Sequence, residues 1–201
     1  NNLGNAYLKQ GLISKAIEEY KKAINIKPDE SLPHSNLGNV YYKLEQFNDS
    51  LLEYRLSIEL EPENASYHYG LGFVYYNLGN RDDAVKEYQT AIKLQPDFPD
   101  AHNNLGIIYY ELGLTDKALE EFRKALIQKF DYPQAHYNTG QVYETLGRYE
   151  DAVSEYSTAI ELKTDYAQAY NNLANIHAMF GDYARSIPEY EKAIGLNPQY
   201  P

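Results

Sequence analysis

An internal repeat of 34 residues constrains the fold of this chain more than any other feature. A Leu-Gly, Thr-Gly or Leu-Ala pair begins at positions 3, 37, 71, 105, 139 and 173. An aromatic residue recurs at the same interval, at Tyr20, Tyr54, Tyr88, Phe122, Tyr156 and Tyr190. A fixed period of this length is typical of stacked supersecondary units. It predicts units 1–30 (lacking its first four positions), 31–64, 65–98, 99–132, 133–166 and 167–200.

Within one unit the apolar residues follow a helical period. Ala101, Leu105 and Ile108 are spaced for one face of a helix. Gly113 interrupts this pattern, and a second stripe begins at Ala118. Each unit is therefore predicted to form two antiparallel helices joined at a glycine turn. Small residues would let the helices approach closely, and the recurring aromatic ring would fill the space beside them.

On these residues the chain resembles the tetratricopeptide repeat family over essentially its whole length. The residues that carry the resemblance in one unit are Leu105, Gly106, Tyr109, Gly113, Ala118, Phe122 and Ala125. The resemblance implies an all-α, right-handed superhelical solenoid of antiparallel helix pairs, with residues 1–201 forming one array. It also implies that the first helix of each pair lines a concave groove. One departure is Pro188 inside the last helix, which we expect to start late, kink or fray.

The two ends of the chain interrupt the repeat. The chain opens inside a first helix and stops directly after the sixth unit. Each unit of a solenoid buries a face of its neighbour, so Ile187, Tyr190, Ile194 and Leu196 would lack a cover. We therefore expect this sequence to be part of a longer protein. The alternative is that the end faces pack on other copies of the chain.

Composition argues against several classes of protein. The chain has no Cys, which excludes disulfides and thiolate metal sites. Its net charge of −11 argues against binding to nucleic acid or to an anionic membrane surface. No apolar run approaches the roughly 20 residues that span a bilayer, so membrane insertion is not expected. The lack of Cys and of an apolar anchor favours a cytoplasmic location.

Histidines recur at the repeat interval, at His34, His68, His102 and His136. Equivalent positions on stacked repeats lie roughly 10 Å apart, whereas zinc ligands lie about 2 Å from a shared ion. We therefore expect these residues, and His177, to pack between helices. The sequence predicts no metal site and no cofactor. It also contains no recognisable catalytic triad or phosphate-binding glycine loop, so the chain is predicted not to be an enzyme.

Asparagine provides the strongest candidate binding site. The residue before each repeated pair is Asn2, Asn36, Gly70, Asn104, Asn138 or Asn172, and one turn further come Asn5, Asn39, Phe73, Ile107, Gln141 and Asn175. Asn is a mediocre helix former, and its amide both donates and accepts hydrogen bonds. Such a row could bind the backbone of an extended peptide. It resembles the asparagine ladder of the repeat domain in O-linked N-acetylglucosamine transferase. The alternative is that these residues stabilise neighbouring helices.

Further residues complete the predicted groove. The tyrosines expected to contact partner side chains are Tyr42, Tyr69, Tyr76, Tyr110 and Tyr137, and Asn103 and Asn171 lie beside the ladder. The expected lining acids Asp100, Glu111 and Glu144 favour a neutral or basic partner segment. The Lys/Arg clamp that chaperone-tail-binding repeats use for a terminal carboxylate is missing.

These patterns favour a non-catalytic protein-interaction scaffold that binds an extended peptide in its concave groove. Two other functions remain open. The chain could be the substrate-recognition segment of a larger enzyme such as a glycosyltransferase, or a structural scaffold that self-associates through its end repeats.

Overall fold

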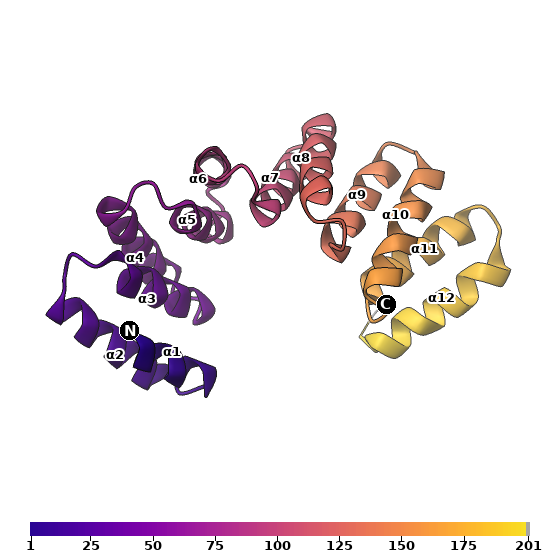
Figure 1. Cartoon of the computed structure of the whole chain (residues 1–201). Coiled ribbons are helices and arrows are strands. Elements are labelled where there is room, and N and C mark those ends of the chain that lie inside the picture. Colours follow the sequence, from indigo (N-terminus) through magenta and orange to yellow (C-terminus); the bar gives the residue numbers. More distant parts are fainter. Residues whose placement is uncertain (200–201) are drawn as a thin grey trace. The chain divides into compact units, whose positions relative to one another are not determined.

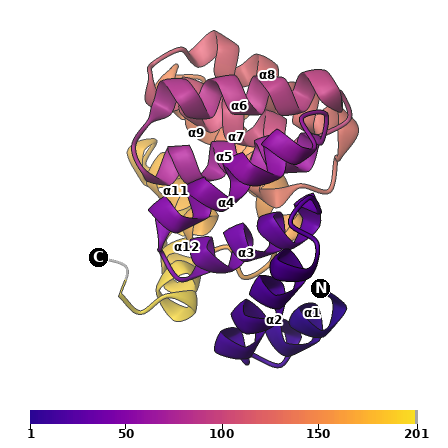
Figure 2. The same cartoon turned by 90° about the vertical axis from the view of Figure 1, so that its left-hand side faces the viewer.

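The computed structural model of the chain describes residues 1–199, which are almost entirely helical. The helices are α1 (Asn2–Lys9), α2 (Ile13–Ile26), α3 (Ser31–Lys43), α4 (Phe47–Leu60), α5 (Ala65–Asn77), α6 (Arg81–Leu94), α7 (Pro99–Glu111), α8 (Thr115–Gln128), α9 (Pro133–Thr145), α10 (Tyr149–Leu162), α11 (Ala167–Met179) and α12 (Tyr183–Leu196). Figures 1 and 2 show how each odd-numbered helix is followed by an even-numbered partner.

Helix boundaries repeat with the period of the sequence. From α3 onward, every first helix has 13 residues and every second helix has 14. Helices pack within a pair, as α3 does with α4, and also between successive pairs, as α4 does with α5. The predicted all-α solenoid of helix pairs is therefore confirmed. The last residue of the sixth predicted unit, at position 200, lies outside the described residues.

The helix pairs fall into two compact units. The first is Asn1–Ala101, and the second begins at His102. The boundary lies inside α7, so each unit is described by itself below. That the six repeats act as one array stays a prediction.

In the first five pairs, a close contact between a glycine and an aromatic ring holds the two helices together. Gly140 lies under Tyr156, and a methyl group added to Gly140 would meet the ring at 2.6 Å. Gly38 lies under Tyr54 in the same way, at 3.1 Å. The fully buried Ala152 lies beside Tyr156. The predicted combination of small residues and one large ring is thus confirmed, and substituting these glycines would force the helices apart.

The turn between the two helices of a pair requires a left-handed backbone. Gly11, Gly79, Gly113, Gly147 and Gly181 have φ between 71° and 80°. Glu45 stands at this position in the second repeat with φ of 58°. A side chain in this conformation costs roughly 1–2 kcal/mol, so the second repeat contains a strained turn that its neighbours avoid.

The expectation that Pro188 delays or frays the last helix is wrong. Helix α12 begins at Tyr183 and ends at Leu196, each 34 residues after the matching boundary of α10, with Pro188 inside it. The side chain of Asp182 accepts a hydrogen bond from the backbone N–H of Arg185, which satisfies a donor in the first turn. Ser186 and Ala193 are almost fully buried, so packing on both sides of Pro188 outweighs the missing backbone hydrogen bond.

The periodic histidines are buried, as expected, and each pairs with a glutamate of the following helix. The distances from Nδ1 to the Glu oxygen are 2.7 Å for His34–Glu53 and 2.6 Å for His68–Glu87, His102–Glu121 and His136–Glu155. His177 pairs with Glu189 at 2.8 Å. Within residues 1–199, no three His, Asp or Glu side chains come together in a group that could hold a metal ion.

Candidate functional site

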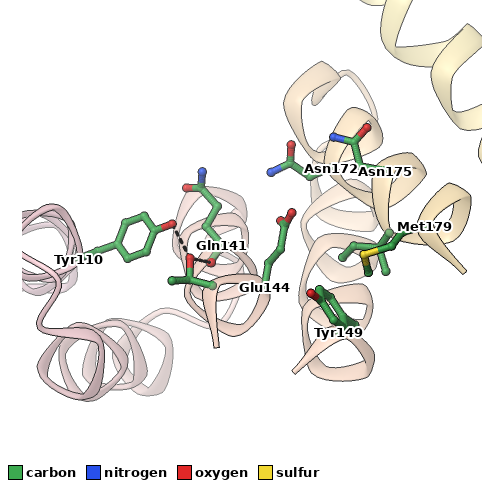
Figure 3. Close-up of a pocket in the computed structure, with 9 residues that line it drawn as sticks. Tyr110, Gln141, Glu144, Tyr149, Asn172, Asn175 and Met179 are labelled. Atoms are coloured by element: carbon green, nitrogen blue, oxygen red, sulfur yellow. Dashed lines mark hydrogen bonds between the residues drawn. The ribbon is translucent and has the colours of Figure 1, made fainter. Parts of the chain in front are cut away.

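In the second unit, the first helices of successive repeats line an open pocket of about 470 Å³, here called the groove pocket. Its residues are Tyr110, Gln141, Glu144, Thr145, Tyr149, Asn172, Asn175, Ile176 and Met179. Figure 3 shows the side chains of Gln141, Glu144 and Asn172 pointing toward the same space, with Tyr110 on the opposite side. Five residues predicted to line the groove thus meet in one pocket: Tyr110, Gln141, Glu144, Asn172 and Asn175.

Some polar atoms of the groove pocket are already bonded and others are open. The buried hydroxyl of Tyr156 donates to Oε2 of Glu144 at 2.6 Å and accepts from Nδ2 of Asn172 at 3.1 Å. Burial first, and the Glu144 carboxylate second, raise the pKa of Tyr156, so its hydroxyl stays a donor. Among residues 1–199, the side-chain amide of Gln141 and Oε1 of Glu144 have no hydrogen-bond partner. These two groups remain available to a ligand.

The ladder asparagines bond to the preceding repeat. Nδ2 of Asn36 donates to Oδ1 of Asn1 at 3.1 Å, and Nδ2 of Asn138 donates to Oδ1 of Asn103 at 3.0 Å. Nδ2 of Asn172 also lies 3.4 Å from the Tyr137 hydroxyl. Each amide nitrogen therefore links neighbouring first helices, as the structural alternative for this row predicts. The side-chain carbonyl oxygens of Asn36 and Asn138 accept no hydrogen bond from the described part of the chain.

The second row of polar residues braces the two helices of one repeat. The hydroxyls of Tyr20, Tyr54 and Tyr190 donate to Oδ1 of Asn5, Asn39 and Asn175, respectively. In the fourth repeat Phe122 has no hydroxyl, and the matching residue is the apolar Ile107, which packs on the same cluster. In these four repeats the polar or apolar character of the row follows the aromatic residue that it faces. The third and fifth repeats depart from this rule, because Phe73 is apolar at the position opposite Tyr88, and the Tyr156 hydroxyl donates to Glu144 instead of Gln141.

The remaining predicted residues occupy varied surroundings. Asn103 is only 4% exposed, and both of its amide atoms are bonded, to Asn104 and Asn138, which leaves it little surface for a partner. The Arg81 guanidinium lies over the Tyr76 ring, 4.2 Å from its centroid, and Tyr137 makes tilted contacts with the rings of Tyr156 and Tyr166. Asn2 and Glu111 are exposed, whereas Asp100 and Asn171 are half-buried.

In the first unit, the first-helix face carries a different pocket, here called the aromatic pocket, of about 470 Å³. Tyr42, Tyr54, Tyr69 and Phe73 supply rings, with the Tyr42 and Phe73 centroids 5.0 Å apart, and no charged residue lines it. Gly70 replaces the ladder asparagine here. A methyl group at Gly70 would lie 2.3 Å from the Tyr54 ring, so that ring occupies the space of the missing side chain.

Four groove-pocket residues were not predicted from the sequence: Thr145, Tyr149, Ile176 and Met179. Thr145 is placed by a 2.9 Å hydrogen bond between its hydroxyl and that of Tyr110, 35 residues earlier. Thr145 and Met179 are the last residues of their first helices, 34 residues apart, so the repeat period marks this position. Tyr149 begins the second helix of its repeat.

Comparison with protein families decides the identity of the repeat. A family described as TPR repeat matches residues 4–45, 38–79, 78–113 and 108–147, and one described as Tetratricopeptide repeat matches residues 137–201. The chain belongs to the tetratricopeptide repeat family. The predicted membership is confirmed over both units of this tetratricopeptide repeat chain.

Solved structures similar to this tetratricopeptide repeat chain agree with that assignment. PilF of Pseudomonas aeruginosa is 20% identical, with a TM-score of 0.89 over 99% of this chain and 90% of PilF. YrrB, described as a TPR protein with an unusual peptide-binding site, is 22% identical, with a TM-score of 0.71 over 92% and 95%. A MamA structure is 27% identical, with a TM-score of 0.71 over 83% and 91%. No curated protein sequence matches this chain.

Among the described residues, no helix combines the length and the apolar character needed to cross a bilayer.

Proposed function

We propose that this chain is a non-catalytic protein-interaction module that binds an extended, neutral or basic segment of a partner in the groove pocket. The observation that carries the proposal is the convergence of Gln141 and Glu144, whose open polar groups face the same space from α9. Membership in a repeat family of interaction scaffolds supports the same class of function.

Gln141 is suited to recognise peptide backbone. Its amide offers an N–H donor and a carbonyl acceptor, which match the C=O and N–H groups of an extended chain. No residue of the described chain uses either group, so a bound peptide displaces only water. The ladder oxygens of Asn36 and Asn138 offer further acceptors on the same row in each unit.

Glu144 sets the preferred charge of the ligand. It is the one charged residue that lines the groove pocket. Its Oε2 is fixed by Tyr156 at 2.6 Å, which holds the carboxylate in place, and Oε1 remains open to the pocket. A positioned carboxylate favours a Lys or Arg side chain and disfavours an acidic peptide.

A protein with a similar fold also has a peptide-binding site. YrrB has a peptide-binding site according to its description and shares this fold at 22% identity. That likeness makes peptide binding on such helices a reasonable expectation, and the specific contacts proposed above come from the residues of this chain.

A displayed library of random 12-residue peptides tests the proposal. Binders selected against the whole chain should be weakened about 3- to 10-fold by Gln141→Ala, in line with the loss of one or two hydrogen bonds. Glu144→Gln should weaken peptides that contain Lys or Arg and should reduce the salt dependence of their binding. Glu161→Gln, an exposed change on α10 outside the pocket, is the matched control. Unchanged affinity of every selected peptide for both groove variants would overturn the proposal.

A further inference from the structure

A second pocket in the second unit shares no residue with the groove pocket. This α8 pocket has a volume of about 830 Å³ and runs along one face of α8, with Thr139, Tyr143 and Glu155 on its other side. Two large apolar side chains border it with most of their surface exposed, Ile127 at 74% and Phe130 at 69%. Isolated exposed apolar residues are ordinary, but two beside one pocket indicate an interaction surface.

The other repeats show that the fold does not require these two residues. The position of Ile127 is occupied elsewhere by Asn25, Glu59, Lys93, Glu161 and Gly195. The position of Phe130 is occupied by Pro28, Pro62, Pro96, Thr164 and Pro198. Every other repeat therefore forms its helix pair with a polar residue or glycine at the first position and proline or threonine at the second. Ile127 and Phe130 are therefore departures that add exposed apolar surface, and the Phe130 ring also contacts the buried His136 ring, with their centroids 5.4 Å apart.

The shape of the α8 pocket fits a helix. Asp116, Glu120, Arg123, Ile127 and Phe130 follow one another at spacings of four, three, four and three residues, with the first four on one face of α8. Fourteen residues of helix span about 21 Å, which is the length of four turns. An extended peptide needs no such continuous face, whereas an amphipathic helix laid alongside α8 would contact it with residues three and four apart.

Charged residues are unevenly distributed along this face of α8. Asp116 lies at one end and has no hydrogen bond or ion pair within residues 1–199. Glu120, one turn on, pairs with Lys124 at 2.7 Å. Arg123 adds a positive charge in the middle of the face, and the other end, at Ile127 and Phe130, is apolar. A helix that complements this face carries a Lys or Arg at the end next to Asp116 and large apolar residues at the other end.

We propose that the α8 pocket docks an amphipathic helix of a partner protein, with its apolar residues on Ile127 and Phe130 and a basic residue at Asp116. This is a second binding surface, and its occupant differs from the extended segment proposed for the groove pocket. The two surfaces would let one chain hold a helix and an extended segment at different sites.

Two substitutions taken from the other repeats test this surface. Ile127→Glu copies the residue at Glu59 and Glu161, and Phe130→Pro copies Pro62 and Pro96, so both should leave the helix pair folded. Circular dichroism and thermal unfolding would verify that. Ile127→Lys, which copies Lys93, is an independent second variant. The probe is a displayed library of 18-residue helices with Leu three and four residues apart and all other positions random.

Selected helices should concentrate Lys or Arg at one end and should lose at least 10-fold in affinity for the Ile127→Glu, Phe130→Pro double variant. They should bind Gln141→Ala and Glu144→Gln as tightly as the original chain, which separates this surface from the groove pocket. Three outcomes would overturn the proposal. The first is equal binding to the double variant, and the second is equal binding of charge-reversed helices. The third is a wild-type dimer in sedimentation that the double variant abolishes, because the occupant would then be a second copy.

Discussion

The hydroxyl of Tyr54 donates a hydrogen bond to Oδ1 of Asn39 at 2.7 Å and so ties the second helix of a repeat to its first. Burial raises the pKa of Tyr54, so the hydroxyl remains protonated as the donor. Tyr20 and Asn5 repeat the arrangement, whereas Phe122 faces Ile107. The asparagines of this row, Asn5, Asn39 and Asn175, are therefore explained first by the hydrogen-bonding needs of the tyrosines that they face.

This relationship predicts the outcome of a double-mutant cycle in the fourth repeat. Phe122→Tyr adds a buried hydroxyl opposite Ile107 and should destabilise the fold by about 1–3 kcal/mol. Ile107→Asn supplies the missing acceptor, so the double variant should be more stable than the sum of the single effects by about 1 kcal/mol. Urea unfolding of the four proteins measures the coupling. Strictly additive changes in unfolding free energy would contradict the view that this row links the two helices of a repeat through hydrogen bonds.

The strained turn at Glu45 predicts a stabilising substitution. Glu45→Gly places glycine where the five other repeats have it in a left-handed conformation, at Gly11, Gly79, Gly113, Gly147 and Gly181. Relief of roughly 1–2 kcal/mol of backbone strain outweighs the extra chain entropy of glycine, about 0.5–1 kcal/mol. Thermal unfolding should show a gain of up to about 1 kcal/mol. Glu45→Ala, which keeps a Cβ, is the control and should give no such gain.

The pair of His136 and Glu155 predicts a dependence of stability on pH. Burial by itself would lower the pKa of His136, but hydrogen bonds with Glu155 and the Phe130 carbonyl outweigh it and raise the pKa above 6.5. Because the folded pKa is the higher one, the stabilisation is complete below about pH 6.5 and is lost as pH rises through the folded pKa. NMR titration of the His136 ring should give a pKa above 6.5.

Glu155→Gln provides the comparison for that titration. The amide keeps a hydrogen-bonding group but removes the charge, so the pKa of His136 should fall and the loss of stability with rising pH should become smaller. An unchanged pKa in Glu155→Gln would show that the carboxylate is not the cause of the shift.

The helices and their contacts within a repeat could be predicted from the sequence because each position is repeated. The 34-residue period marks the glycine under each ring, the turn and the helix ends. The rule that proline interrupts a helix fails at Pro188, because it does not include the packing of Ser186 and Ala193 on either side of this residue. The glutamate partners of the histidines have the same period, Glu53, Glu87, Glu121 and Glu155, and this shared spacing could have identified them.

The candidate site was harder to predict because spacing places a residue on a face but does not assign its hydrogen bonds. Asn138 lies on the expected row, yet its amide nitrogen bonds to Asn103 of the preceding repeat. Gln141, on the second row, has the open amide. The two amides differ because Asn138 has the Asn103 side chain within hydrogen-bonding distance and Gln141 has no such neighbour within residues 1–199. Repeat spacing alone does not give this distance. The α8 pocket could have been suspected by comparing equivalent positions, since Ile127 is the one large apolar residue at its position.

The side-chain amide signals of a ¹⁵N-labelled chain test the central claim most directly. On titration with a selected extended peptide, the NH₂ signal of Gln141 should shift strongly, because its amide is unoccupied in the groove pocket. The NH₂ signal of Asn138 should shift little, because it already donates to Asn103 at 3.0 Å. A peptide that binds tightly while the Gln141 signal stays unchanged would contradict the account.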